Sequence, residues 1–320
     1  MAAAGAETPI VTRSNPQQYL FRFELTVENK SELQQIFSVI MPHSESGNYQ
    51  DIEYRELSGE VVAMADGKGN VIDTLVTLGP KEKKTIVNEF VATVYDAHAD
   101  FSKIDGIYPY NKESDIYKRY TGVELPHVDP GEAGVKGIHE KLSAAVKDDL
   151  EYARAAFDYV MDNISYYRAG VYSVAAVVKR KSGSCVDQSG LFVSLLRCRG
   201  IPARLLSGYR VTGGTHARAE FYLEKYGWIP ADIGFGTSKK ESRLFGKSVS
   251  DTFASTVTQV YSGHVYLPAD EFSFVTPKIN AAMVPIKAYA GSSVGVKGTK
   301  GTITKLDNGV PVGEPKKIPL

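Results

Sequence analysis

The chain has 320 residues, of which 43% are hydrophobic, and it carries 37 basic and 37 acidic side chains. This length and composition suit a globular protein with two or three domains. A balanced charge creates no overall field that would attract nucleic acid or an anionic membrane surface, so we expect no nucleic-acid partner.

No run of 18 or more apolar residues occurs, so the sequence predicts a soluble chain without a membrane span. The first residues, Met1–Glu7, lack the basic and apolar regions of a signal peptide. They fit an exported protein, periplasmic or extracellular, whose signal has been removed, and equally a cytoplasmic one. The sequence therefore leaves the compartment open.

Apolar and polar residues alternate, or β-forming residues cluster, in three segments near the start of the chain: Tyr19–Val27, Glu53–Ala65 and Thr85–Tyr95. Turn signals lie between them, which is typical of antiparallel strands. We predict an N-terminal β-sandwich domain over 17–105. The next segment, 106–136, is polar and contains turn-forming residues such as Asp129-Pro130-Gly131, so it is predicted to be a linker.

A helical period then replaces the alternation. Apolar residues recur every three or four positions from Leu150 to Ile164, and a second helix is predicted over 185–199 with apolar residues on two sides. Three strands follow, at Ala203–Tyr209, His216–Leu223 and Trp228–Ile233. This order of elements predicts an α+β catalytic domain over 137–290.

The last segment, 291–320, is rich in glycine, lysine and threonine. Asp307-Asn308-Gly309 is a hairpin signal. We expect a glycine-rich tail or a β-ribbon here.

The chain has only two cysteines, Cys185 and Cys198, and both lie in the second predicted helix. A helix rises about 1.5 Å per residue, which would separate their α-carbons by roughly 20 Å. A disulfide needs less than about 7 Å. Cys185 is therefore expected to be a free thiol.

Cys185 lies in the first turn of this helix, directly after a capping-box-like Ser184 and two residues before Asp187. The free amides and the positive end of the helix dipole favour thiolate, the reactive form of cysteine, and can also stabilise an oxyanion. A buried structural cysteine is the alternative interpretation. The thiolate interpretation makes Cys185 a candidate nucleophile.

His216 begins a predicted strand, on whose polar face we expect it to be partly accessible. Asp232 lies on the following strand at a position of equal parity, so the two side chains can share one face of an antiparallel pair if the turn sets the register. A thiol, an imidazole and a carboxylate together correspond to a nucleophile, its base and the group that orients the base.

Three blocks in this order resemble the core of the transglutaminase-like superfamily: Gly183-Ser184-Cys185, Thr215-His216-Ala217 and Gly227-Trp228-Ile229-Pro230-Ala231-Asp232. The 17–105 region also resembles the β-sandwich that often precedes this core in bacterial members. The resemblance implies a papain-like fold and an acyl-thioester on Cys185, with Cys185, His216 and Asp232 as the catalytic triad. Two departures affect the expected substrate more than the chemistry: Arg218 stands where the family commonly has tryptophan, and Ile233-Gly234 follows the aspartate.

Other candidate residues point to no cofactor and no metal, because the remaining histidines are scattered without ligand spacing. His127 and His139 are expected to be solvated. Tyr166 and Tyr167 are interpreted as packing against the first helix, with a substrate-lining role as the alternative. A side-chain oxyanion donor is expected just upstream of the cysteine, where the sequence does not distinguish among its candidates: Lys179, Arg180, Lys181 and Ser182.

We expect an enzyme that cleaves peptide or carboxamide bonds, with a peptide or protein as its substrate. The alternatives are a transglutaminase that passes the acyl group to an amine, and a binding module without turnover. Hydrolysis is favoured because it needs no second substrate site.

Overall fold

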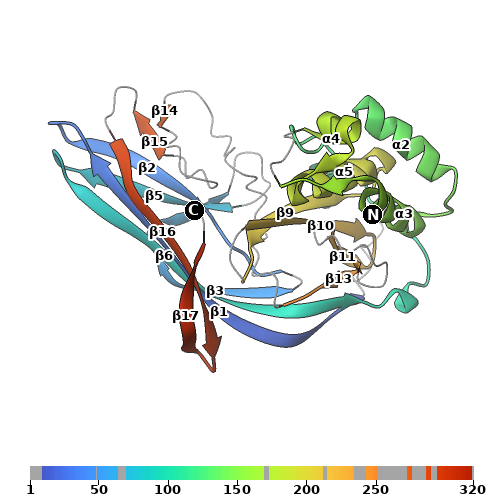
Figure 1. Ribbon diagram of the computed structural model, residues 1–320, viewed down its shortest axis with the longest axis horizontal. Coiled ribbons are helices and arrows are strands. Elements are labelled where there is room, and N and C mark those ends of the chain that lie inside the picture. Colours follow the sequence, from blue (N-terminus) through green and yellow to red (C-terminus); the bar gives the residue numbers. More distant parts are fainter. Residues whose placement is uncertain are drawn as a thin grey trace. The chain divides into compact units, whose positions relative to one another are not determined.

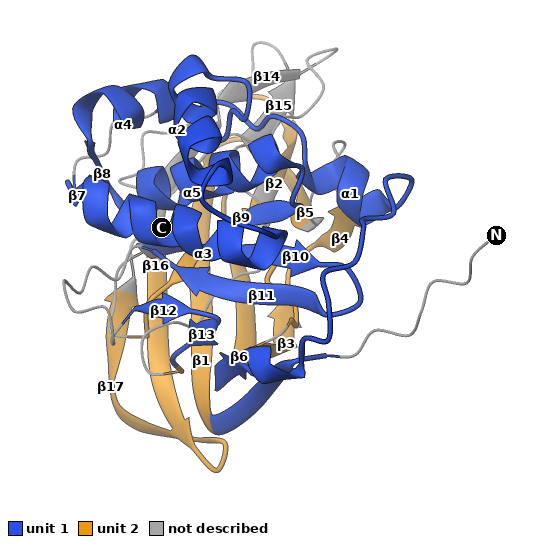
Figure 2. Ribbon diagram, turned by 90° about the vertical axis from the view of Figure 1, so that its right-hand side faces the viewer, with its two compact units in different colours: residues 1–15, 95–206, 216–249 blue, residues 16–94, 207–215, 250–320 orange. Residues whose placement is uncertain are grey.

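The fold is α+β, as predicted, and it divides into two compact units. The computed structural model describes residues 9–47, 49–63, 70–168, 173–211, 215–233, 243–250, 272–275, 286–289 and 294–318. Unit 1 comprises residues 1–15, 95–206 and 216–249, and unit 2 comprises residues 16–94, 207–215 and 250–320 (Figure 2). Each unit is thus assembled from three separate stretches of chain.

Unit 2 is built from antiparallel strands. They are β1 (Val11–Asn29), β2 (Gln35–Pro42), β3 (Gln50–Leu57), β4 (Glu60–Ala63), β5 (Asn70–Leu78), β6 (Lys83–Ala99), β14 (Phe272–Val275), β15 (Ile286–Tyr289), β16 (Val294–Asp307) and β17 (Val310–Ile318) (Figure 1). One sheet contains β6-β1-β16-β17 with β3 on β6, and the other has the order β14-β15-β2-β5-β4. Strands β1 and β6 continue into unit 1.

The two sheets of unit 2 share a hydrophobic core. Leu25 and Val27 of β1 are buried with Phe37 and Val39 of β2 and with Val76 of β5. On each strand these residues alternate with more exposed ones, as expected for a strand with one face in the core. This packing makes unit 2 a β-sandwich. The sequence predicts such a sandwich over 17–105, whereas unit 2 comprises 16–94 together with 207–215 and 250–320.

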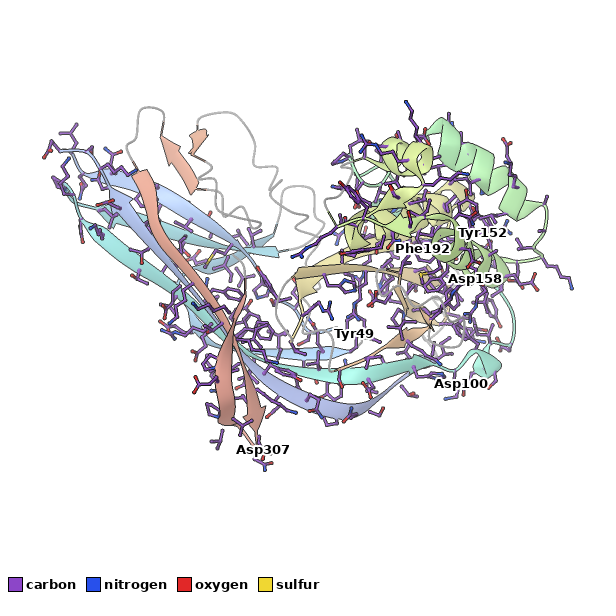
Figure 3. All side chains as sticks on the ribbon, in the orientation of Figure 1. Tyr49, Asp100, Tyr152, Asp158, Phe192 and Asp307 are labelled. Carbon is purple, nitrogen blue, oxygen red and sulfur yellow. The ribbon has the colours of Figure 1, made fainter. Side chains whose placement is uncertain are left out.

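The C-terminal strands are part of this sandwich. β16 pairs with β1 from Gln18↔Leu306 to Asn29↔Val294, and β15 pairs with β2. β16 and β17 form a hairpin that turns after Asp307 (Figure 3), at Asn308 and Gly309, which both have positive φ as a type I′ turn requires. The predicted ranges 137–290 and 291–320 follow the linear chain, whereas the units do not: 137–290 is divided between the two units, and 291–320 belongs wholly to unit 2.

Unit 1 contains the helices and a second sheet. Its elements are η1 (Phe101–Lys103), α1 (Asp115–Tyr120), α2 (Ala133–Ser143), α3 (Asp149–Asn163), β7 (Ser165–Tyr166), α4 (Val174–Arg180), β8 (Ser182–Gly183), α5 (Cys185–Arg199), β9 (Ala203–Tyr209), β10 (Thr215–Leu223), β11 (Gly227–Asp232), β12 (Leu244–Phe245) and β13 (Lys247–Ser248). Strands β9–β12 form a sheet in the order β12-β11-β10-β9. Helix α1 and the start of α2 lie in the 106–136 segment, which the sequence predicts to be a linker.

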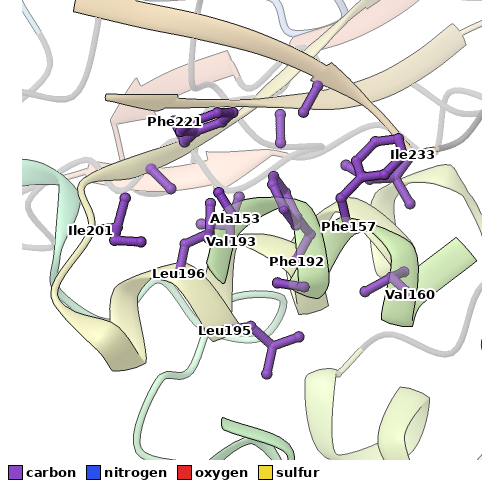
Figure 4. Close-up of a cluster of buried hydrophobic side chains, with 14 of the residues drawn as sticks. Ala153, Phe157, Val160, Phe192, Val193, Leu195, Leu196, Ile201, Phe221 and Ile233 are labelled. Atoms are coloured by element: carbon purple, nitrogen blue, oxygen red, sulfur yellow. The ribbon is translucent and has the colours of Figure 1, made fainter. Parts of the chain in front are cut away.

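Helix α5 is enclosed by the core of unit 1, as its two apolar sides predict. Every residue from Asp187 to Arg197 is buried. Phe192 of α5 meets Phe157 of α3 edge to face at 6.0 Å between ring centroids, and Phe221 of β10 packs nearby (Figure 4). This packing fixes the helix that begins at Cys185.

In the described part of the chain no helix is long and apolar enough to cross a membrane.

Candidate active site

Cys185 is the first residue of α5, and it is half-buried. The turn before it is held by Asp187, whose Oδ2 accepts hydrogen bonds from the backbone amide of Ser184 at 2.9 Å and from its hydroxyl at 2.7 Å. Gly183 is required next to this turn, because an added Cβ would lie 2.5 Å from the Asp187 Cβ. The backbone amides of the first helical turn point toward the N-terminal end of α5, where Cys185 lies.

His216 and Asp232 are in contact. The imidazole Nε2 lies 2.9 Å from Oδ1 and 3.0 Å from Oδ2 of the carboxylate. The sequence predicts a partly accessible His216, which is wrong: its side chain is 5% exposed. The reason is that the polar face of β10 is covered as well, since Arg218 and Glu220 on that face are each 1% exposed.

The strand register explains how the two side chains meet. β10 and β11 pair with Ala219 opposite Ala231, and one further step of this register places Arg218 opposite Asp232. His216 is therefore the diagonal neighbour of Asp232 on the same face, within reach of a long side chain. Arg218 donates from Nη1 to the hydroxyl of Ser248 on β13.

Cys185 and His216 perturb each other's titration. Burial alone would raise the pKa of the Cys185 thiol, but a hydrogen bond and the charge of His216, with a hydrogen bond to the Ala217 backbone, lower that pKa below its ordinary value. Burial would lower the pKa of His216, but the charge and hydrogen bond of Asp232, together with Cys185, raise it to about 9. Both shifts favour a thiolate beside an imidazolium.

The arrangement assigns the two ring nitrogens of His216. Nε2 is bound to Asp232, which leaves Nδ1 for Cys185. A thiolate held in this way is a nucleophile, and the imidazolium can supply a proton to a leaving group.

The other predicted site residues are less closely connected to this group. Lys179, Arg180 and Lys181 are exposed, and Ser182 is half-buried in β8, paired with Ser165. His264 and Gly234 lie outside the described residues. Among those that are described, no group of three or more His, Cys, Asp or Glu side chains is placed to hold a metal ion.

The sequence predicts that Tyr166 and Tyr167 pack against α3, the first predicted helix, and the structure does not show this packing. Their side chains are 55% and 53% exposed. β7 pairs in parallel with β8, and the amide of Tyr167 donates to the carbonyl of Gly183 at 2.8 Å. Both rings are thus exposed to solvent, and Tyr166 pairs with Gly183, which lies two residues before Cys185. The alternative interpretation, a substrate-lining role, stays a prediction.

Sequence reasoning missed His127. It was expected to be solvated, but its side chain is 9% exposed and its Nδ1 lies 3.6 Å from Oδ1 of Asp187. No local signal marks this residue, because its contact is with Asp187, which lies far from it in the sequence.

Comparison with known proteins identifies a similar sequence family and a similar fold. Residues 136–233 match the family model of the transglutaminase-like superfamily core. A protein of Haemophilus influenzae, named only as uncharacterized, is 37% identical over a stretch that covers 26% of this chain and 28% of that protein. The match therefore spans less than a third of the length of this relative.

Two solved structures are similar to the chain. A candidate cysteine protease from Cytophaga hutchinsonii has a TM-score of 0.58 and 14% identity, with 95% of both chains covered, so the fold extends over nearly the whole molecule. The periplasmic domain of TgpA from Pseudomonas aeruginosa has a TM-score of 0.39 and 15% identity, covering 73% of this chain and 98% of that one.

Proposed function

The chain carries a transglutaminase-like domain over residues 136–233, and on that premise we propose that it is a cysteine-dependent acyl-transfer enzyme that hydrolyses peptide or carboxamide bonds. The observation that supports this function is the chain of contacts from Cys185 to His216 and from His216 Nε2 to Asp232. In this proposal Cys185 is the nucleophile, His216 its base and Asp232 the orienting group, and each is within hydrogen-bonding reach of the next.

The reaction follows from the protonation states of these groups. The Cys185 thiolate attacks the carbonyl carbon, and the amides at the start of α5 stabilise the oxyanion. His216, as imidazolium, transfers its proton to the amine as the C–N bond breaks, which leaves an acyl-thioester on Cys185. His216 then takes a proton from water, and the hydroxide attacks the thioester. The intermediate collapses to release the carboxylic acid and to leave Cys185 as the thiolate beside the His216 imidazolium.

Mass spectrometry of the wild type and of Cys185→Ala tests this proposal. Each protein is incubated with a panel of peptides, with and without a primary amine, and an iodoacetamide probe is applied in parallel. We expect the wild type to form cleaved products and an adduct on Cys185, and Cys185→Ala to form neither. Alanine in a first helical turn costs little helix propensity, so the fold should be retained, and circular dichroism checks this.

Cys198→Ala is the matched control. Cys198 lies in the same helix, and burial raises the pKa of its thiol. Its loss should leave turnover unchanged. A Cys185→Ala variant that still turns over substrate would refute the mechanism, and a product with the mass of an amine adduct would identify an amine, instead of water, as the acyl acceptor.

A further inference from the structure

Four residues of α5 form one side of the helix: Asp187, Gly190, Ser194 and Arg197. They are spaced by three or four positions, so their side chains lie above one another along a single face. All four are buried. The segment that covers this face is residues 122–129, which we call the 122–129 hairpin. It precedes the residues that match the family model.

The base of the 122–129 hairpin is fixed to the C-terminal half of α5. Arg197 donates from Nη1 to the carbonyl of Gly122 at 2.6 Å and from Nη2 to Glu124 at 2.9 Å. The amide of Asp129 donates to the hydroxyl of Ser194 at 3.0 Å. Glu124 and Val128 exchange two backbone hydrogen bonds, which close the hairpin.

The tip of the hairpin reaches the N-terminal half of α5. The carbonyl of Pro126 accepts a hydrogen bond from the amide of Val174, the first residue of α4, at 3.1 Å. A Cβ on Gly190 would lie 2.5 Å from the carbonyl oxygen of His127, so the hairpin backbone approaches the helix closely at this point. The imidazole of His127 then lies with Nδ1 3.6 Å from Oδ1 of Asp187.

Asp187 links this contact to the nucleophile. Its Oδ2 binds the amide and the hydroxyl of Ser184, the residue directly before Cys185, and its Oδ1 faces His127. The Asp187 side chain is 0% exposed, and a buried carboxylate requires polar partners on both oxygens. Ser184 with the start of the helix supplies partners on one side, and His127 faces the other.

We propose that His127 is a positioning residue that acts through Asp187 to hold the first turn of α5, from which Cys185 attacks. The inference rests on the proposed function of Cys185. His127 is not a catalytic residue, because its contact is with Asp187 and the helix backbone. Without it, the Asp187 carboxylate would lose a polar neighbour, and Ser184 would be held less firmly. The first turn of α5 would then hold Cys185 less well for its contact with His216, which disfavours a reactive thiolate.

The rate of iodoacetamide labelling as a function of pH tests this role. The measurements use a Cys198→Ala background, so that Cys185 is the one thiol, and each variant is also checked by thermal unfolding. We expect His127→Ala to move the labelling midpoint upward by about half a pH unit or more, which is roughly a threefold lower labelling rate on the acidic side. His127→Asn should restore most of the rate, because its amide nitrogen can occupy the place of Nδ1.

Two further variants separate positioning from general stability. In an Asp187→Asn background, His127→Ala should cause no additional shift, since the two residues act as one unit. His139→Gln removes a histidine whose Nδ1 lies 2.9 Å from the Tyr152 hydroxyl, and it should lower the melting temperature without moving the midpoint. If His127→Ala does not fold, the ¹⁵N chemical shift of His127 Nδ1 in the wild type and in Asp187→Asn tests the contact directly.

The outcomes are distinguishable. This inference alone is overturned if the labelling midpoint is unchanged in His127→Ala. It is also overturned if the ¹⁵N chemical shift of His127 Nδ1 is the same in the wild type and in Asp187→Asn. A wild-type Cys185 that labels like an ordinary thiol overturns the proposed function and this inference with it.

Discussion

His216 has two partners, Asp232 and Cys185, and both raise its pKa. Because its pKa is raised to about 9 while the pKa of Cys185 is lowered, we expect the thiolate and the imidazolium to coexist from the lowered pKa of Cys185 up to about pH 9. Iodoacetamide labelling of Cys185 should thus remain substantial well below the pKa of a free thiol, which is about 8.5.

Replacing His216 should reverse this behaviour. In His216→Ala the imidazolium no longer opposes the effect of burial on the thiol pKa. Labelling of Cys185 should therefore require a pH above the pKa of a free thiol. The measurement is the labelling rate against pH in both proteins, with Cys198→Ala as the background. A single step in the labelling rate at about pH 8.5, the pKa of a free thiol, found in both proteins, would argue against an ion pair of Cys185 and His216.

Asp232 holds the imidazole through both carboxylate oxygens. Asp232→Asn should cause a partial loss of kcat, because a neutral amide can still accept from Nε2. Asp232→Ala should cause a larger loss, on the order of 10²-fold or more, since the ring loses both its orientation and the charge that stabilises the imidazolium. Steady-state kinetics at several pH values check this. Full activity of the alanine variant would assign the orienting role to another acceptor and leave a dyad of Cys185 and His216.

Among the elements, α5 depends on a close backbone contact at Gly190. An alanine Cβ would lie 2.5 Å from the carbonyl oxygen of His127, a separation at which the 122–129 hairpin must move. We expect Gly190→Ala to lower the free energy of unfolding by roughly 1–3 kcal/mol, the range for overpacking, despite the better helix propensity of alanine.

Gly137 provides the matched control. It lies within α2, and an added Cβ would meet nothing within 4 Å. Gly137→Ala should raise the free energy of unfolding by up to about 1 kcal/mol through helix propensity. Urea unfolding of both variants compares them, and equal effects at the two glycines would contradict the close contact at Gly190.

For the molecule as a whole, the C-terminal hairpin is a structural part of unit 2. Ile303 of β16 is 2% exposed and packs in one cluster with Phe21 of β1 and Phe90 of β6. Ile303→Ala should therefore lower the free energy of unfolding by about 2–4 kcal/mol. Val310 in β17 is 62% exposed, and Val310→Ala should change it by no more than about 0.5 kcal/mol. Denaturant unfolding tests both, and a neutral Ile303→Ala would contradict the role of β16 in this core.

The sequence by itself determined the local elements around the site. The predicted helix 185–199 has the bounds of α5, and the three predicted strands agree with β9, β10 and β11 to within one residue at each end. Helical period, strand alternation and turn residues are properties of neighbouring positions, so they can be recognised without the fold. The order of Cys185, His216 and Asp232 on these elements was visible for the same reason.

Only the tertiary structure decided which distant segments meet. The sequence does not specify that β16 pairs with β1, because any strand edge offers the same backbone groups and the partner depends on the whole core. It also does not specify that Asp232 lies diagonal to His216, or that His127 is buried against Asp187. These relations depend on register and on packing between residues far apart in the chain, and no local pattern of amino acids encodes them.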